Sequence, residues 1–343
     1  MSSTQKIIVL RFSAMGDVAM VASVLQEFSE QNPSAELIMV SRPAFKPFFN
    51  HIPNLIFHPI QPKTIHKGIN GLYKLYQELR SYKPDAIADL HDNLRSRVIS
   101  TFFRLTGTTI KRIDKGRGEK KALTQTVNKV FKPLKQTVER YADVFRELGF
   151  SIKLSHQISK SAQALPEKAK TWFSDQTPKK IGISPFAQHI YKVYALEKME
   201  TVIASLSQLG YNLFIFGGGE REQHVAENWA KTYQNTYNLI GNFNLTEELA
   251  IISNLDLMLS MDSSGMHMAS LVGIPVVSIW GPTHPYAGFL GYGQQESDCI
   301  QIDHPTRPNS IYGNKPCLCG VENCIDLIEP KTIVNKIKEK LNG

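Results

Sequence analysis

The sequence predicts an α/β protein in which two doubly wound parallel sheets face a central cleft. Short apolar runs rich in Val, Ile and Leu alternate with helical periods of apolar residues, and this alternation occurs twice, in residues 6–149 and 179–342. Strands that alternate with helices form parallel sheets with helices on both faces. The polar stretch between the two series, residues 155–178, contains Pro166 and Pro178 and is typical of a linker.

The first series begins with a strand over 6–12 and a helix whose apolar stripe runs from Val18 to Phe28. Further strands are predicted at 35–41, 54–60 and 85–90, and further helices at 69–82 and 136–149. Pro84 ends one of these helices, and Gly149 is a suitable C-cap for the other.

The second series predicts strands at 179–185, 211–216, 236–241, 256–262 and 275–281, and helices at 196–210, 220–233, 245–255, 266–273 and 329–342. We therefore place one domain at 1–165 and a second at 166–328, followed by a C-terminal helix at 329–343. Ligands of such sheets bind beyond the carboxyl ends of the strands. Both sets of strand ends are therefore expected to line one cleft.

The composition is that of a soluble globular protein, with 42% hydrophobic and 20% charged residues. Its apolar runs are too short for a transmembrane helix. The N-terminus reaches Arg11 after only a few apolar residues, which is too short for the core of a signal peptide. We therefore expect a cytoplasmic protein.

The net charge of +8 is concentrated in one window. Residues 111–140 contain ten Lys or Arg and three acidic residues, which gives this window a net charge of +7. Such a window attracts an anionic partner, for example nucleic acid, lipid headgroups or a phosphorylated substrate. A solvated helical face is the alternative interpretation.

The four cysteines, Cys299, Cys317, Cys319 and Cys324, all lie in the last fifth of the chain. They are too few for a disulfide framework. The cluster CLCGVENC could be a metal site, but its C-x-C spacing is unusual for zinc and no second pair of ligands follows. Structural or incidental thiols are the favoured interpretation, and no metal site is predicted.

Four motifs that could bind a ligand lie at predicted strand ends. Two of them offer a charged side chain. Asp17 follows the turn at Gly16 and opens a helix, where an acidic residue is most often a cap favoured by the helix dipole. Lys192 follows the strand at 179–185 and could pair with a phosphate, although an exposed loop lysine is the commoner case.

The other two motifs are rich in small residues. In FIFGGGEREQ three glycines would let a ligand approach the backbone, and Glu220 or Glu222 could accept bonds from ribose hydroxyls; a plain glycine turn is the rival. In DSSGMH, small residues and helix N–H groups make an anion site, whereas His267 could simply be a packed core residue. The chain has no D-x-D motif, which argues against a diphosphate held by a metal ion.

In their order and approximate spacing, the S-x-x-G-D-V turn, the D-S-S-G-M-H block and the later W-G-P-T resemble the bacterial lipopolysaccharide heptosyltransferases of glycosyltransferase family 9. The resemblance covers nearly the whole chain. It implies the GT-B fold of two Rossmann-like domains, with the acceptor bound by the N-terminal domain and the nucleotide-sugar by the C-terminal one. It also implies that the last helix packs back toward the first domain.

The implied reaction is an inverting, metal-independent transfer of a sugar, with ADP-heptose as the expected donor substrate and no cofactor. Asp17 would take the proton from the acceptor hydroxyl, and Lys192 would stabilise the leaving diphosphate. The residues expected to bind the donor by this resemblance are Gly16, Gln188, Glu222, Phe243, Asp262, Ser263, Ser264, Gly265 and His267.

The expected acceptor is a lipopolysaccharide inner core or another phosphorylated or acidic glycan. Arg95, Arg97, Arg112 and Lys115 are the candidate acceptor-binding residues. Lys and Arg near an anionic surface contribute about 1 kcal/mol each, so the basic window would hold the enzyme peripherally on the inner face of the inner membrane.

Several positions depart from the family's pattern. Arg11 stands where many members have Lys, Ser264 where Gly is usual, Gly265 where Pro is frequent, and Ser23 where Pro is common. These departures leave open a family member that uses another nucleotide-sugar.

A protein that binds a nucleotide-sugar without turnover is a further alternative. Nucleic acid is not an expected partner, because no interleaved aromatic residues accompany the basic window. A dehydrogenase is disfavoured, because neither half has GxGxxG followed by an acid about 20 residues later.

Overall fold

The computed structural model describes residues 5–174 and 178–342, which form two compact units. The first unit comprises Met1–Lys115 and Lys135–Ser155, and the second comprises Gly116–Leu134 and His156–Gly343. The sequence-based boundary lay at residue 165, so the observed division falls ten residues earlier. A larger difference concerns residues 116–134. They lie within the predicted first domain but belong to the second unit.

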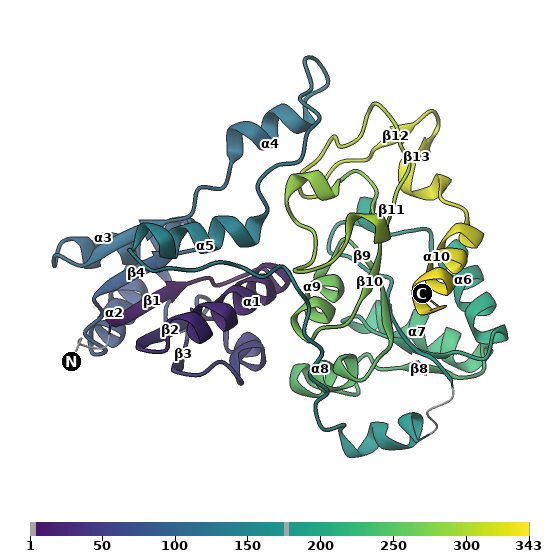
Figure 1. The fold of residues 1–343 in the computed structure, drawn as a ribbon, viewed down its shortest axis with the longest axis horizontal. Helices are drawn as coiled ribbons and strands as arrows, with labels where there is room; N and C mark the ends of the chain where they lie inside the picture. The colour runs from purple at the N-terminus through teal and green to yellow at the C-terminus, as the bar shows by residue number, and fades with distance from the viewer. Residues whose placement is uncertain (1–4, 175–177, 343) are drawn as a thin grey trace. The chain divides into compact units, whose positions relative to one another are not determined.

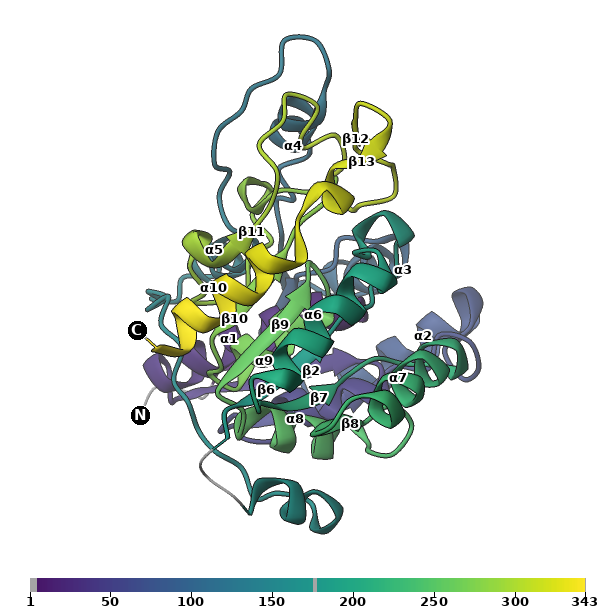
Figure 2. The same cartoon turned by 90° about the vertical axis from the view of Figure 1, so that its right-hand side faces the viewer.

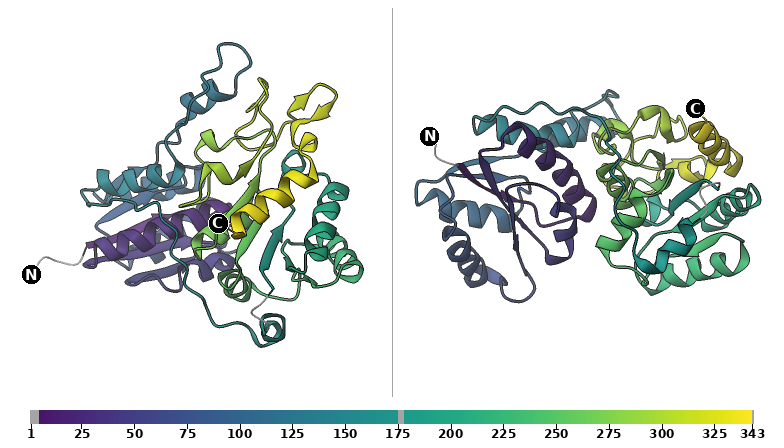
Figure 3. Two further views of the ribbon diagram at one scale, coloured as in Figure 1. Left: turned by 45° about the vertical axis from the view of Figure 1, so that its right-hand side comes forward. Right: turned by 60° about the horizontal axis from the view of Figure 1, so that its bottom comes forward.

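The first unit is a parallel sheet with the strand order β3-β2-β1-β4-β5 among the described residues (Figure 1). Its elements are β1 (Gln5–Leu10), α1 (Met15–Gln31), β2 (Ala35–Ser41), η1 (Pro43–Phe49), β3 (Leu55–Pro59), α2 (Gly68–Arg80), β4 (Ala86–Asp89), α3 (Leu94–Arg104), β5 (Thr109–Arg112) and α5 (Thr137–Glu147). Helices α1 and α5 pack together, and so do α2 and α3. Within each unit, helices lie on both sides of the sheet (Figure 3).

The central strands of the first unit are apolar throughout because both of their faces are covered. In β1 the residues Ile7, Ile8, Val9 and Leu10 are fully buried. Continuous apolar runs of this kind are expected of parallel strands between two layers of helices. This burial explains why the sequence predicted these strands correctly.

The second unit is a parallel sheet with the order β11-β10-β9-β6-β7-β8 and a separate hairpin of β12 and β13. Its elements are α4 (Arg117–Thr124), η2 (Glu167–Phe173), β6 (Lys180–Ser184), η3 (Ile190–Lys192), α6 (Leu196–Gln208), β7 (Asn212–Ile215), α7 (Glu220–Thr232), β8 (Thr236–Asn238), α8 (Leu245–Ser253), β9 (Leu257–Met261), α9 (Ser264–Leu271), β10 (Val276–Ile279), η4 (Pro285–Ala287), η5 (Glu296–Asp298), β11 (Cys299–Ile300), β12 (Leu318–Cys319), β13 (Glu322–Asn323), η6 (Cys324–Leu327) and α10 (Pro330–Asn342).

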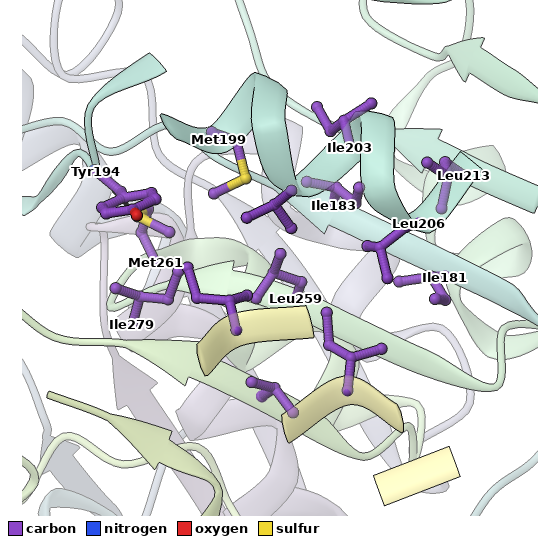
Figure 4. Close-up of a cluster of buried hydrophobic side chains, with 14 of the residues drawn as sticks. Ile181, Ile183, Tyr194, Met199, Ile203, Leu206, Leu213, Leu259, Met261 and Ile279 are labelled. Carbon is purple, nitrogen blue, oxygen red and sulfur yellow. Dashed lines mark hydrogen bonds between the residues drawn. The ribbon is translucent and has the colours of Figure 1, made fainter. Parts of the chain in front are cut away.

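The core of the second unit joins its sheet to α6 and α10. Met199, Ile203 and Leu206 of α6 pack over Ile183 and Leu259 of the central strands (Figure 4). Helix α10 lies beside α6 (Figure 2) and buries its apolar side in the same core. The expected packing of this last helix toward the first domain stays a prediction.

The segment 116–134 is held by the second unit through a small apolar cluster. Leu123 and Leu134 are buried against Ala287, and the Lys120 ammonium lies 4.3 Å from the centre of the Phe289 ring. The backbone N–H of Leu134 also donates to the carbonyl of Tyr286. The basic window is therefore divided between the two units.

Three basic side chains of this window are also not free in solvent. Lys120 and Arg140 are buried, and Lys129 donates to three backbone carbonyls. Within the described residues, no helix is both long and apolar enough to cross a membrane.

Candidate active site

The second unit has a topological switch point between β6 and β9, which are neighbours in the middle of the sheet. The chain continues from β6 to β7 on one side and from β9 to β10 on the other, so the loops after β6 and β9 separate there. Ligands of doubly wound sheets bind at this point, beyond the carboxyl ends of the strands. Lys192 lies on the first loop, and Asp262 follows the second strand directly.

Three side chains meet at this switch point. The Lys192 ammonium lies 2.9 Å from Oδ2 of Asp262, and the hydroxyl of Thr283 donates to the same oxygen at 2.8 Å. The Lys192 and Asp262 side chains are only 15% and 8% exposed. Lys192 is therefore a fixed, mostly desolvated cation, which excludes the alternative of an exposed loop lysine.

Gly313 makes room for the lysine side chain. A Cβ atom at Gly313 would lie only 2.2 Å from Cδ of Lys192, and the glycine has a φ of +75°. The loop that carries Gly313 therefore runs directly along the aliphatic part of Lys192. This contact and the role of Thr283 were not predicted, although Thr283 belongs to the G-P-T motif.

The N-terminus of α9 points its free amides to the same end of the sheet. Ser263 is the extended N-cap residue, and Ser264 and Gly265 begin the helix. The first N–H groups of a helix lack partners within it and favour anions. Gly265 lets this helix start close to the strands, because a Cβ there would lie 2.4 Å from the Ser184 hydroxyl oxygen. His267, one turn further on, is buried.

The other predicted donor residues lie at the ends of β6, β7 and β8. Oε2 of Glu222 accepts a hydrogen bond from the Gly218 N–H at 2.8 Å, so this carboxylate folds back onto the glycine turn. Phe243 makes an edge-on contact with Trp172, with ring centres 5.9 Å apart. Gln188 is exposed on the loop that leads to Lys192.

The first unit has its own switch point, between β1 and β4. Gly16 and Asp17 lie in the first turn of α1, directly after β1. Oδ2 of Asp17 lies 2.5 Å from the Arg11 guanidinium and accepts from the Ala14 N–H at 3.2 Å. The Tyr141 hydroxyl lies 3.5 Å from Oδ1. Asp17 is thus both a helix cap and an oriented carboxylate, 24% exposed.

His91 stands on the other side of this switch point and was not predicted as a site residue. Its Nδ1 accepts a hydrogen bond from the Phe12 N–H at 3.2 Å, and its ring packs edge-on against the Phe12 ring. Burial, together with the charges of Arg11 and Lys115, lowers the pKa of His91 to about 3. The imidazole is therefore neutral near pH 7. Its position directly after the strand at 85–90 was the available signal.

Three of the four candidate acceptor residues gather around the end of β4. Arg97 lies 2.7 Å from Oδ1 of Asp92, Arg112 donates to Asp89 at 3.1 Å, and Lys115 donates to the Asp92 carbonyl at 3.2 Å. Arg95 is exposed on α3 and is not part of this group. The two carboxylates partly neutralise the group, so its remaining attraction for an anion is moderate.

Two doubly wound units in tandem, each with polar side chains at its switch point, form the GT-B fold. Two solved structures are similar to this one over 98–100% of this chain. One is a family 9 glycosyltransferase from Veillonella parvula (TM-score 0.75, 18% identity, 98% of that chain). The other is Escherichia coli heptosyltransferase WaaC with ADP (TM-score 0.68, 17% identity, 100% of that chain).

The family follows from the sequence. Residues 72–309 match the family model of glycosyltransferase family 9 (heptosyltransferase), so the chain belongs to this family and is a glycosyltransferase. It is also similar to lipopolysaccharide core heptosyltransferase OpsX of Haemophilus influenzae, with 26% identity over 81% of this chain and 79% of that protein.

Proposed function

We propose that this protein transfers heptose from ADP-heptose to an inner-core lipopolysaccharide acceptor, with inversion at the anomeric carbon. The names of its relatives support this choice of substrates: OpsX is a lipopolysaccharide core heptosyltransferase, and WaaC was solved with ADP. The observation that carries the proposal is the mostly buried cluster of Lys192, Asp262 and Thr283 beside the N-terminus of α9.

On the donor side this cluster serves a diphosphate. The Lys192 ammonium has three N–H donors, so it can keep its bond to Asp262 while it donates to a phosphate oxygen. The free amides at Ser264 and Gly265 add neutral donors whose dipole favours an anion. When the bond between the sugar and ADP breaks, negative charge grows on the diphosphate. These groups stabilise that charge without needing a metal ion.

On the acceptor side Asp17 is the general base. The acceptor hydroxyl oxygen attacks the anomeric carbon from the face opposite the diphosphate, its proton passes to the Asp17 carboxylate, and the electrons of the broken bond leave with ADP. Arg11 and Tyr141 hold the carboxylate in one orientation. Such positioning is what general base catalysis requires.

The membrane contact is proposed to lie on the loop after α4. Val127, Val130 and Phe131 are 74%, 43% and 51% exposed. Lys121 and Lys132 are exposed beside them in the sequence. Apolar side chains flanked by lysines suit an anionic lipid surface, because the chains enter the headgroup layer while the charges stay outside.

The central test compares Asp17→Asn with the matched variant Asp85→Asn. Asp85 is an exposed acid whose carboxylate accepts from the Lys6 N–H at 2.7 Å, at the amino end of the same sheet. Asn at 17 keeps the shape and cannot take the proton. Asp17→Asn should therefore lower heptose transfer by roughly 10²-fold or more and leave ADP affinity nearly unchanged.

Asp85→Asn should behave as the wild type in both measurements. Normal turnover of Asp17→Asn would end the assignment of the base. A panel of nucleotide-sugars scored by thermal unfolding separates the choice of donor from the mechanism, because the preferred donor raises stability by mass action. A clear preference for another nucleotide-sugar, or binding of the donor with no transfer to any acceptor, would replace the proposed reaction by one of the alternatives above.

A further inference from the structure

The three C-terminal cysteines lie on one face of a tight hairpin. Gly320, with a φ of +79°, and Val321 join β12 to β13, and Leu318 pairs with Asn323. This register puts Cys317 opposite Cys324, whose N–H donates to the Cys317 carbonyl at 2.7 Å. Residues two positions apart on a strand face the same side. The thiols of residues 317, 319 and 324 are therefore neighbours.

His304 reaches the same place from a loop 13 residues earlier. Its imidazole nitrogen and the sulfur atoms of Cys319 and Cys324 lie within 4.8 Å of one another. The Cys317 sulfur is 2.9 Å from that of Cys324, which forms a disulfide with Cys319. The Thr306 hydroxyl bridges Nδ1 of His304 at 2.9 Å and the Cys317 sulfur at 3.2 Å. Four soft donor atoms are thus gathered in one small volume.

Two cations, Lys129 and Arg307, lie next to the hairpin. The Lys129 ammonium donates to the carbonyls of Pro305, Arg307 and Pro308 at 3.0–3.2 Å. The Arg307 side chain is buried and donates to the Gly281 and Thr283 carbonyls. This positive surrounding suits a group of thiolates.

We propose that Cys317, Cys319, Cys324 and His304 bind one thiophilic transition-metal ion, zinc in the first place, with tetrahedral geometry. Three thiolates and one imidazole are a common ligand set of structural zinc sites. Zinc is bound by thiolates and not by disulfide sulfur atoms, so the Cys319–Cys324 disulfide has to be opened before the ion binds.

Metal binding requires the reduced hairpin. A dithiol supplies two electrons and two protons to Cys319 and Cys324 and becomes a disulfide. A phosphine supplies the two electrons and becomes a phosphine oxide with the oxygen of one water molecule, whose two protons complete the thiols. The metal ion then replaces the protons of the three thiols, which are released to solvent. The ion would fix the loop that carries Arg307 and Gly313, and Gly313 lies against Lys192.

The test uses the full-length chain, purified without oxygen in the presence of a phosphine reductant. Zinc and iron are measured by elemental mass spectrometry in the wild type, in Cys317→Ser and in the matched control Cys299→Ser. Cys299 is a free cysteine of the same unit outside the hairpin. We expect about one equivalent of metal per chain in the wild type and in Cys299→Ser, and less than about a tenth of this in Cys317→Ser.

A second measurement does not depend on the folding of a variant. Co²⁺ added to the reduced wild type should give the charge-transfer and d–d absorption of tetrahedral cobalt thiolate, and zinc should displace it. The proposal is wrong if the reduced wild type binds only traces of zinc and iron and gives no cobalt spectrum. It is also wrong if Cys317→Ser keeps a full equivalent. None of these results depends on heptose transfer, so they leave the proposed function untouched.

Discussion

Replacing Gly265 by alanine tests how closely α9 approaches the sheet at the proposed diphosphate site. The added Cβ would lie 2.4 Å and 2.5 Å from Oγ and Cβ of Ser184, and 3.0 Å from Oγ of Ser260. Gly265 does not have a left-handed φ, so its backbone accepts alanine. The outcome is therefore decided by the contact and not by backbone strain.

Two contributions of opposite sign determine how Gly265→Ala changes the free energy of unfolding. Alanine in a helix is favoured over glycine by roughly 0.5–1 kcal/mol, whereas an extra methyl group in a tightly packed place costs about 1–3 kcal/mol. Gly265→Ala should therefore destabilise by up to about 2.5 kcal/mol. At about 2–4 °C per kcal/mol for a domain of this size, the midpoint of thermal unfolding should fall by up to about 10 °C.

The assay is thermal unfolding followed by calorimetry, with Gly118→Ala as the matched control. A Cβ on Gly118, in α4, would meet nothing within 4 Å, so that variant should be as stable as the wild type or more stable. Combining Gly265→Ala with Ser184→Gly removes both of the closest atoms and should recover part of the lost stability. A Gly265→Ala protein more stable than the wild type, or no coupling to Ser184→Gly, would refute the close approach.

Three further predictions concern charge, pH and lipid. Lys192→Ala should weaken ADP binding by about 10- to 150-fold in calorimetry, because a charge-assisted hydrogen bond is worth about 1.5–3 kcal/mol. The matched control Lys231→Ala, on the exposed face of α7, should bind ADP as the wild type does. Equal ADP affinities of Lys192→Ala and the wild type would contradict the phosphate role. His91 has a folded pKa of about 3, below its unfolded value, so its contribution to stability is present above about pH 6.5 and is lost as the pH falls. Lowering the pH to 5 should cost about 2 kcal/mol in denaturant unfolding, and this cost should be absent in His91→Asn. The double variant Val127→Ser, Phe131→Ser should bind anionic vesicles at least about tenfold more weakly in sedimentation than the wild type, and unchanged binding would remove this loop from the membrane contact.

Sequence reasoning was most successful where burial is complete. The central strands could be predicted because parallel strands covered on both faces are apolar throughout. Strand β5, with the sequence TIKR, was missed because it lies at a sheet edge and is polar. The two-residue strands β11, β12 and β13 carry too few residues for a periodic pattern.

The site was predictable only as far as single strand ends. Asp17, Lys192 and Asp262 stood out because each follows an apolar strand closely. His91 and Thr283 matter because β4 lies beside β1 and β10 beside β9, and this strand order cannot be read from local pattern. The binding of residues 116–134 to the second unit was equally hidden, since it depends on contacts of Leu123 and Leu134 with residues more than 150 positions away.

The path of the chain through residues 116–134 has a practical consequence for dissecting this enzyme. The chain passes between the units three times, after residues 115, 134 and 155. A fragment that starts at residue 156 would therefore lack Leu123 and Leu134, and the apolar surface around Ala287 would be exposed to solvent. A separately expressed second unit should therefore include residues 116–134, joined by a flexible linker ahead of residue 156.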